Sequence, residues 1–501
     1  MEKELQNFKI ARFALNARYD DIGEASVEQL KRHLLDALGS LIHAGNKPAI
    51  QKLLRQLQVM GEGGKCKVPL IENLPYDRAA QLYTALIRYP DFMDNFMGKE
   101  ATCHPSDNIG PLLAVAQFGP ISGKDFLAAM AVAYQIECRL VLEIPVMKEG
   151  IDHTLLLGYS MTAGIARLLN LTEEQTAHAL GITGTSISPM VSSRASYTYE
   201  WKGFASSLDA LNCVNICFLA REGMTGPVAI FEGPKGFDDV FGMKLDYDWD
   251  SETFELLPRC VLKKYNVEVH AQATLEALDE LRKQQQVNPE EIENVELTTF
   301  LTAYHIIGSG AYGNRQIVET KEQADHSLFY AAAVLLLDGE VYPEQYEPER
   351  IKNNDVQRLL KKVKVSTGFP LHQPLIVAGI LDPYTVAYPN KMKTKVEIGL
   401  KNGQTLTREQ EDYHGFFTRP FTWDDTIEKF RRLSNNIVSA EMQEQLIGTV
   451  RNLENLPEIS TLINLLAAIK KKIFKPPWQL QGHGPAGDLR PDSRQAAKWR
   501  T

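Results

Sequence analysis

The sequence of 501 residues lacks the patterns that hold metal ions, iron–sulfur clusters or nucleotides. Its six cysteines include no Cys-x-x-Cys pair, and Cys213 and Cys217, which could share a helix face, are too few for a metal site. We expect all six to be free, buried thiols in a reducing cytosol. The glycine-rich residues 308–313 do not open a helix after a strand, so we expect a flexible loop there.

Targeting and membrane segments are also lacking. Residues 1–7 are charged and have no apolar core of the kind found in signal peptides, and no run of about 18 apolar residues could span a bilayer. The net charge of −9 argues against a nucleic-acid surface, which needs clustered positive charge. We therefore expect a cytoplasmic protein with no nucleic-acid or membrane partner, in which any anionic ligand needs a locally positive pocket.

What is present is an ordinary globular composition, with 44% hydrophobic and 23% charged residues. The length predicts two or three domains. Apolar residues recur at helical spacing in the first half of the chain, and Thr172 with Gln175 has the form of a capping box that opens a helix. The other helices expected in this half cover residues 27–41, 111–117, 123–142, 155–169 and 206–220.

Near Pro258 the sequence pattern changes from helices alone to a mixture of helices and strands. Alternating residues predict strands, and Asn402-Gly403 predicts the turn of a hairpin. The expected strands are residues 292–300, 363–366, 395–400 and 405–407, and the expected helices are residues 270–284, 331–337, 424–433 and 440–468. We predict a mainly α fold with a large all-helical domain (1–264 and 411–474), a smaller α/β domain (265–410) and a disordered tail (475–501).

Short polar segments interrupt the apolar, helix-forming sequence and contain four histidines. They are residues 91–94, 104–108, 150–153, 199–203, 269–272 and 324–330. Together they offer acids, bases and cations, but no spacing typical of metal ligands. This combination suits the movement of a proton next to a carboxylate on a small, multiply charged acid.

Three of these residues also have structural interpretations that the sequence leaves open. Asp94 could cap a helix, or it could act as a base or orient one. Pro105 keeps His104 out of helical geometry, just ahead of a helix N-terminus that favours an anion. His153 could bind a ligand, or it could be a surface histidine capped by Asp152.

Two cations, two further histidines and a tyrosine complete the set. Arg194 can bind a carboxylate through two parallel hydrogen bonds, and Lys202 can act as a point charge. Alternatively, both residues could lie in a solvated loop. His270 opens a helix, and His326 and Tyr330 lie four residues apart on one helix face. Tyr330 could donate a proton, although a polar contact at a helix end would also explain it. The joint occurrence of these residues favours a functional site.

In this order, the segments resemble the MmgE/PrpD family, whose members include 2-methylcitrate dehydratase, cis-aconitate decarboxylase and iminodisuccinate epimerase. The resemblance covers most of residues 5–465. It rests on the motifs Asp-Phe-Met-Asp, His-Pro-Ser-Asp-Asn, Gly-Ile-Asp-His, Lys-Gly, Val-His-Ala-Gln-Ala and Asp-His-Ser-Leu-Phe-Tyr. The second and third of these motifs are most similar to the dehydratase branch.

The resemblance implies a large helical domain built from both ends of the chain and a smaller α/β lid domain between them. It also implies a homodimer without a metal ion or an organic cofactor, and an active site in the cleft between the two domains. The residues that fall on the family's catalytic positions are Asp94, His104, His153, Lys202, His270 and Tyr330. We expect Arg194, Lys264 and His326 to bind the substrate.

The resemblance further implies a lyase that acts on a small di- or tricarboxylate, with dehydration of 2-methylcitrate or a similar hydroxy acid as the preferred reaction. Residues 95–103 and 192–201 depart from the dehydratase pattern, so the substrate stays open. Decarboxylation of the cis-aconitate type and epimerisation of the iminodisuccinate type use the same kinds of residue and remain alternatives. A non-catalytic dimeric scaffold is a further alternative.

Overall fold

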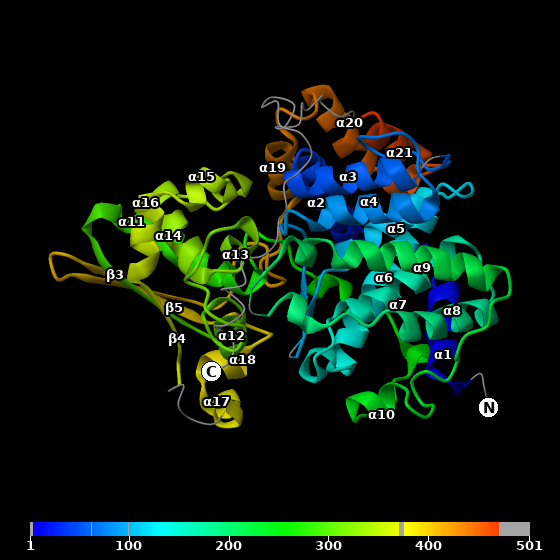
Figure 1. Ribbon diagram of the computed structural model, residues 1–501, viewed down its shortest axis with the longest axis horizontal. Helices are drawn as coiled ribbons and strands as arrows, with labels where there is room; N and C mark the ends of the chain where they lie inside the picture. Colours follow the sequence, from blue (N-terminus) through cyan, green and yellow to red (C-terminus); the bar gives the residue numbers. More distant parts are fainter. Residues whose placement is uncertain (1–3, 62, 99, 196, 370–374, 470–501) are drawn as a thin grey trace.

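The protein is described by a computed structural model that covers residues 4–61, 63–98, 100–195, 197–369 and 375–469. Helices dominate it, which confirms the expected mainly α class. In Figure 1 the four-stranded sheet and its helices occupy one side of the molecule, and a helical body occupies the other. The tail expected to be disordered, residues 475–501, lies outside the described residues. No described helix has both the length and the apolar character that a membrane span requires.

The helical body contains one large hydrophobic cluster, with core residues from Ile10 to Cys260 and from Ile427 to Ile469. Helix α6 packs against α7, α4 against both α5 and α9, and the late helices α19 and α20 against α2. The bounds are α1 Gln6–Asn16, α2 Glu24–Ala44, α3 Pro48–Met60, α4 Tyr76–Arg88, α5 Ile109–Val115, α6 Gly123–Glu143, α7 Thr154–Leu168, α8 Glu173–Ser186, α9 Ala205–Arg221, α10 Phe237–Phe241, α19 Trp423–Ser434, α20 Ala440–Arg451 and α21 Ser460–Ala467.

Local sequence explains several of these helices. The capping box predicted ahead of α8 is present: the Gln175 backbone N–H donates to Thr172 Oγ1, and the Thr172 N–H donates to Gln175 Oε1. Gly164 lets α7 approach α6, because a Cβ at this position would lie 3.3 Å from the Cβ of Ala133. One prediction was wrong in detail. Residues 440–468 form two helices rather than one, because Pro457 lies between α20 and α21 and cannot continue a helix.

The second hydrophobic cluster contains Met97 and core residues from Val261 to Phe416. Its elements are α11 Gln272–Gln285, β3 Ile292–Thr299, α12 Leu301–Ile307, α13 Lys321–Ala324, α14 Leu328–Asp338, α15 Pro348–Ile351, α16 Asn354–Leu359, β4 Val363–Thr367, α17 Leu375–Leu381, α18 Pro383–Ala387, β5 Thr394–Leu400 and β6 Thr405–Gln410. The first cluster gives way to the second between Cys260 and Val261, and the second gives way to the first between Phe416 and Ile427. Both points lie close to the expected domain boundaries at 264/265 and 410/411, which stay predictions.

The sheet has the strand order β4-β3-β5-β6, and its four strands confirm the segments predicted from alternation. β3 pairs in parallel with β4 and antiparallel with β5, and β5 and β6 form the predicted hairpin. Gly403 occupies the left-handed region with φ of 87°, as the Asn-Gly turn signal requires. α11 packs on β5 and β6, and α14 packs on β4. A separate short hairpin, β1 Phe96–Met97 with β2 Thr102–Cys103, lies next to the segment that carries His104.

Candidate active site

A cavity of about 250 Å³ lies where the two hydrophobic clusters meet. The helical body contributes Asp91, Thr102, His104, His153, Arg194 and Lys202 to its wall. The sheet-containing part contributes Lys263, Glu268, His270, Tyr312, His326 and Tyr388. Together with His305, five histidines and three cations therefore line one small space, although they come from segments far apart in the sequence.

A larger cavity of about 690 Å³ is lined in part by residues 197–201. We do not regard it as the catalytic site. Two of its lysines are paired with carboxylates: Lys47 with Glu347 at 2.9 Å, and Lys52 with Glu200 at 2.6 Å. His43 is the single histidine in its lining. It therefore lacks the several histidines that converge on the smaller cavity.

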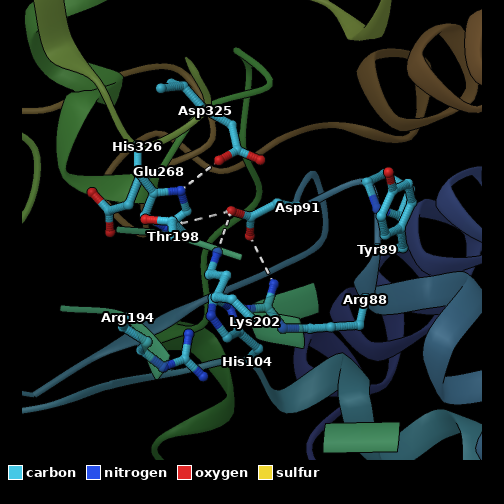
Figure 2. A network of polar contacts seen from close by, with 12 residues as sticks. Arg88, Tyr89, Asp91, His104, Arg194, Thr198, Lys202, Glu268, Asp325 and His326 are labelled. Carbon is cyan, nitrogen blue, oxygen red and sulfur yellow. Dashed lines mark hydrogen bonds and ion pairs between the residues drawn. The ribbon is translucent and has the colours of Figure 1, made fainter. Parts of the chain in front are cut away.

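Asp91 is the electrostatic centre of the smaller cavity (Figure 2). It follows α4 directly after Tyr89-Pro90 and adopts a left-handed backbone with φ of 57°. Arg88 Nη1 donates to its Oδ1 at 2.8 Å and Lys202 Nζ to its Oδ2 at 2.7 Å. Lys263 Nζ lies 3.3 Å from Oδ1 and also donates to the Asp91 carbonyl at 2.8 Å. Three buried cations thus share one carboxylate.

This arrangement changes the pKa of both Asp91 and Lys202. Burial would raise the pKa of the Asp91 carboxyl, but Lys202, Lys263 and Arg88 outweigh it and hold that pKa well below its usual range. Burial, assisted by Arg88 and opposed by Asp91, lowers the pKa of Lys202 to about 7. The Lys202 ammonium can therefore exchange its proton near neutral pH.

Arg194 is held at the cavity wall by Asp152. The Arg194 guanidinium donates to both Asp152 oxygens, with Nη2 to Oδ1 at 3.1 Å and Nε to Oδ2. Burial and the nearby Arg194 lower the pKa of His153 to about 3, and its buried Nδ1 has no hydrogen-bond partner in the described structure. His153 is thus a neutral imidazole with one nitrogen unused by the protein.

His104 lies next to His153, with ring centroids 5.4 Å apart in an edge-to-face arrangement. Its Nδ1 lies 2.7 Å from Asn95 Nδ2 and 3.3 Å from the Asp94 carbonyl oxygen, and these contacts fix the ring. Burial and Arg88 hold the pKa of His104 well below its usual range. Two neutral imidazoles therefore lie on the same side of the cavity.

Two further histidines of the cavity wall are each paired with a carboxylate. His270 Nδ1 lies 2.7 Å from Glu268 Oε1, and His270 Nε2 lies 2.9 Å from the Tyr388 hydroxyl. His326 Nδ1 lies 2.5 Å from Asp325 Oδ1. Each carboxylate fixes the orientation of its imidazole in the way that acid–base catalysis requires.

The structure brings together six of the nine residues predicted to form the site. His104, His153, Arg194, Lys202, His270 and His326 all line the cavity. Their roles stay predictions. The local sequence explains the positions: His104 precedes the 3₁₀ turn Pro105–Asn108, His153 precedes α7, and His270 lies in the 3₁₀ turn Val269–Ala271 ahead of α11.

The other three predicted residues do not line the cavity. Asp94 accepts from the Ser106 backbone N–H at 2.9 Å and lies 2.7 Å from His33 Nδ1, so it holds the His104 segment in place. Lys264 Nζ pairs with Glu276 at 2.9 Å.

Tyr330 lies in α14, but His326 precedes that helix, so the two do not share a helix face as expected. Its hydroxyl donates to the Gln345 backbone carbonyl, and burial raises its pKa. We therefore assign neither catalysis to Asp94 or Tyr330 nor substrate binding to Lys264.

Their places are taken by residues that sequence reasoning did not select. Asp91 replaces Asp94, and both lie in the same Asp-x-x-Asp motif, so the motif itself was a correct signal. Lys263 replaces its neighbour Lys264 in the same way. Tyr388 lies 118 residues after His270 and belongs to none of the polar segments, so no signal in the sequence identified it.

Among the described residues, Asp91, Asp325 and His326 offer atoms within 4.8 Å of one another that could hold a metal ion. The surrounding charge opposes that use. Lys202 and Arg88 already donate to Asp91, and Lys321 pairs with Asp325 at 2.7 Å. A divalent cation would have to displace these cations from the carboxylates, so the residues present fit an anionic ligand better than a metal.

Comparison with known proteins identifies two family domains in the chain. The family model of the MmgE/PrpD N-terminal domain matches residues 8–250, and that of the MmgE/PrpD C-terminal domain matches residues 265–455. The space between the two matches, residues 251–264, includes the point where the core residues change from one hydrophobic cluster to the other.

Curated relatives carry two enzyme names. The 2-methylcitrate dehydratase of Salmonella typhi is 26% identical over 393 residues, which cover 74% of this chain and 79% of the relative. That of Cupriavidus necator is 28% identical over 359 residues, which cover 66% of this chain and 71% of the relative. The cis-aconitate decarboxylase of Mus musculus is 24% identical over 473 residues, which cover 90% of this chain and 91% of the relative.

Proposed function

Because the chain belongs to the MmgE/PrpD family, we propose that it is a cofactor-free lyase acting on a small di- or tricarboxylate. The reaction we favour is dehydration of 2-methylcitrate or a similar hydroxy acid. One observation carries the proposal: three buried cations converge on the single carboxylate of Asp91, next to two neutral histidines. This leaves an excess of positive charge for substrate carboxylates, with bases beside it.

The first task of the site is to bind carboxylates against the net charge of −9 that the whole chain carries. Lys202 and Lys263 each have donors beyond the one shared with Asp91, and an ammonium has three. Arg194 presents its guanidinium in a fixed orientation because Asp152 holds it. We assign these three cations to the substrate carboxylates, including the one next to the carbon that loses a proton.

The second task is proton transfer. Elimination of water needs a base for the proton on carbon and an acid for the departing hydroxyl. The neutral imidazoles of His104 and His153 and the carboxylate-paired His270 are candidate bases. Lys202, whose pKa is lowered to about 7, is a candidate acid because it can give up a proton to the leaving hydroxyl at neutral pH.

Decarboxylation of a cis-aconitate-like substrate is the second candidate, and the full-length similarity to the mouse decarboxylase supports it. The same cations would hold the carboxylates that remain while carbon dioxide leaves, and one acid would protonate the resulting carbanion. Epimerisation would need an acid–base group on each face of the substrate. A non-catalytic scaffold is disfavoured, because it would not need five histidines and three cations around one cavity.

Proton NMR in heavy water tests the proposal with a panel of 2-methylcitrate, citrate, cis-aconitate and iminodisuccinate. Signals of an unsaturated tricarboxylate from 2-methylcitrate support the hydro-lyase. Itaconate from cis-aconitate would establish the decarboxylase instead, and deuterium exchange without a new skeleton would establish the epimerase. No reaction with any of the four would refute the proposed substrate class.

We also propose that the protein is a cytoplasmic homodimer, as the family resemblance implies. Light scattering coupled to size-exclusion chromatography tests the dimer directly. A mass near twice the 56.2 kDa of the chain supports it, and a mass near 56.2 kDa contradicts it.

A further inference from the structure

We propose that Tyr388 is a further catalytic residue of this site: its oxygen takes a proton from the substrate while its own proton moves to His270. The inference rests on the proposed function, because it supplies the base for that reaction. It concerns a residue outside all the polar segments of the sequence. The observations that carry it are a chain of short contacts that runs from Glu268 through His270 to Tyr388 and ends at the cavity.

The direction of the hydrogen bonds follows from Glu268. Burial would raise the pKa of this carboxyl, but His270 outweighs it and lowers the pKa to about 2, so Glu268 is ionised and can only accept. Its Oε1 lies 2.7 Å from His270 Nδ1, which therefore carries a hydrogen. We infer a neutral His270 in the resting site, in which the other nitrogen is an acceptor. The Tyr388 hydroxyl, 2.9 Å from His270 Nε2, then donates to it.

The oxygen of Tyr388 is also held in position from other directions. Its ring stacks on Phe300 with centroids 4.7 Å apart and an interplanar angle of 13°. Thr102 Oγ1 lies 3.5 Å from both the Tyr388 hydroxyl and His270 Nε2. Tyr388 is only 6% exposed, yet it lines the cavity together with Thr102 and His270. The hydroxyl is therefore fixed at the cavity wall with a lone pair available to a ligand.

Two other buried tyrosines of the second hydrophobic cluster, Tyr330 and Tyr346, are used differently. Tyr330 donates to the Gln345 carbonyl and Tyr346 donates to the Asn266 carbonyl, and neither backbone acceptor can take up a proton. Tyr388 donates to an imidazole, which can. A tyrosine that served only to fill space or satisfy a carbonyl would not need a titratable partner that is itself oriented by a buried carboxylate.

Each proton in the proposed reaction has a defined donor and acceptor. The substrate C–H bond breaks and its proton joins the Tyr388 oxygen, while the proton already on that oxygen moves to His270 Nε2. The imidazolium that forms is stabilised by Glu268. The electron pair left on the substrate carbon forms the double bond, the C–O bond breaks, and the hydroxide takes a proton from Lys202 to leave as water. His270 then releases its proton to solvent and Lys202 takes one up from solvent, so Tyr388, His270 and Lys202 all regain their starting protonation states.

The activity test compares Tyr388→Phe with Tyr384→Phe. Phenylalanine at 388 keeps the stacking on Phe300 and removes only the hydroxyl, and Tyr384 is a nearby tyrosine that does not line the cavity. We expect Tyr388→Phe to lower kcat by about 10² to 10⁴-fold, the usual contribution of general acid–base catalysis. KM should stay within about threefold, because the carboxylate-binding cations are untouched. Tyr384→Phe should behave as wild type. A kcat of Tyr388→Phe within threefold of wild type would overturn the proposal.

A second readout does not depend on turnover. Nitrogen-15 NMR of histidine-labelled protein, with the His270 signals identified by their loss in His270→Gln, reports which ring nitrogen carries the hydrogen. We expect hydrogen on Nδ1 and a hydrogen-bonded Nε2 whose shift changes in Tyr388→Phe but not in Tyr384→Phe. Hydrogen on Nε2, or no change in Tyr388→Phe, would overturn the relay. If the wild type converts none of the four substrates, the proposed function fails, and this spectrum still decides the relay separately.

Discussion

Substitution of Asp91 by asparagine tests the central electrostatic feature of the site. Asparagine keeps the size of the side chain but removes the negative charge that Arg88, Lys202 and Lys263 share, all with a nitrogen within 3.3 Å of a carboxylate oxygen. Each cation is at most 5% exposed, so solvent offsets little of the lost charge. Removal of one member of a buried ion pair typically costs about 3–5 kcal/mol of unfolding free energy.

The structure also predicts how this cost depends on pH. In the variant, Lys202 can avoid being an unpaired buried charge by releasing its proton, since its pKa is already lowered to about 7 in the wild type. Without Asp91 that pKa falls further, whereas in the unfolded chain it stays near its usual value of 10.5. Below pH 7 the folded variant then binds fewer protons than the folded wild type. Its stability relative to wild type should fall as the pH falls, by up to about 1.4 kcal/mol per pH unit.

Chemical denaturation at pH 6, 7 and 8 measures this effect, with Asp94→Asn as the matched control. Asp94 contacts His33 and the Ser106 backbone and is not paired with the three cations, so its variant should lose less stability and show no such slope. Turnover should fall steeply in Asp91→Asn and less in Asp94→Asn. A loss below about 1 kcal/mol in Asp91→Asn, with no pH dependence, would refute the reasoning.

Three further predictions follow from the pKa values and contacts of individual side chains. If Lys202 is the acid, kcat/KM should fall about tenfold per pH unit above pH 7, and a pH–rate profile that stays flat to pH 9 would contradict this. Tyr330→Phe should keep near-full turnover, because the hydroxyl donates to the Gln345 carbonyl and does not line the cavity. Its unfolding free energy, measured by denaturant titration, should fall by about 1 kcal/mol. A large loss of kcat would show instead that Tyr330 takes part in catalysis. All six cysteines are buried, and burial raises the pKa of Cys66 to about 12, so a thiol reagent at pH 7.5 should label none of them within minutes unless denaturant is added.

The fold was largely predictable because periodicity and turn chemistry are local properties. The four strands of the sheet, the capping box at Thr172 and most helices of the first half follow from them. The break between α20 and α21 was missed although Pro457 marked it. The boundaries between the two hydrophobic clusters depend on long-range packing, which periodicity does not report.

The site was predictable at the level of segments but not of single side chains. Asp91 and Asp94 lie in one motif, and the sequence does not show which of them faces the cavity. Asp91 has a left-handed backbone, and Lys202 and Lys263, from two other segments, pair with its carboxylate. Lys263 and Lys264 are neighbours that point to different carboxylates, Asp91 and Glu276.

Tyr388 could not be found by spacing at all. It reaches His270 only because the chain between them forms α11, β3 and β4 and then returns to the cavity. The signal that identifies it is three-dimensional: a phenol hydroxyl within hydrogen-bond distance of an imidazole that is already paired with an ionised carboxylate.

The most direct test of the account is calorimetric titration with propane-1,2,3-tricarboxylate, which has the carboxylates of the proposed substrates but no hydroxyl to eliminate. The two variants to compare are Lys202→Met, which removes a cation from the cavity, and Lys264→Met, which removes a cation that the structure places outside it. We predict that the wild type and Lys264→Met bind with the same affinity and that Lys202→Met binds at least tenfold more weakly. Equal binding by Lys202→Met, or weakening only in Lys264→Met, would contradict the claim that this cavity binds polycarboxylates.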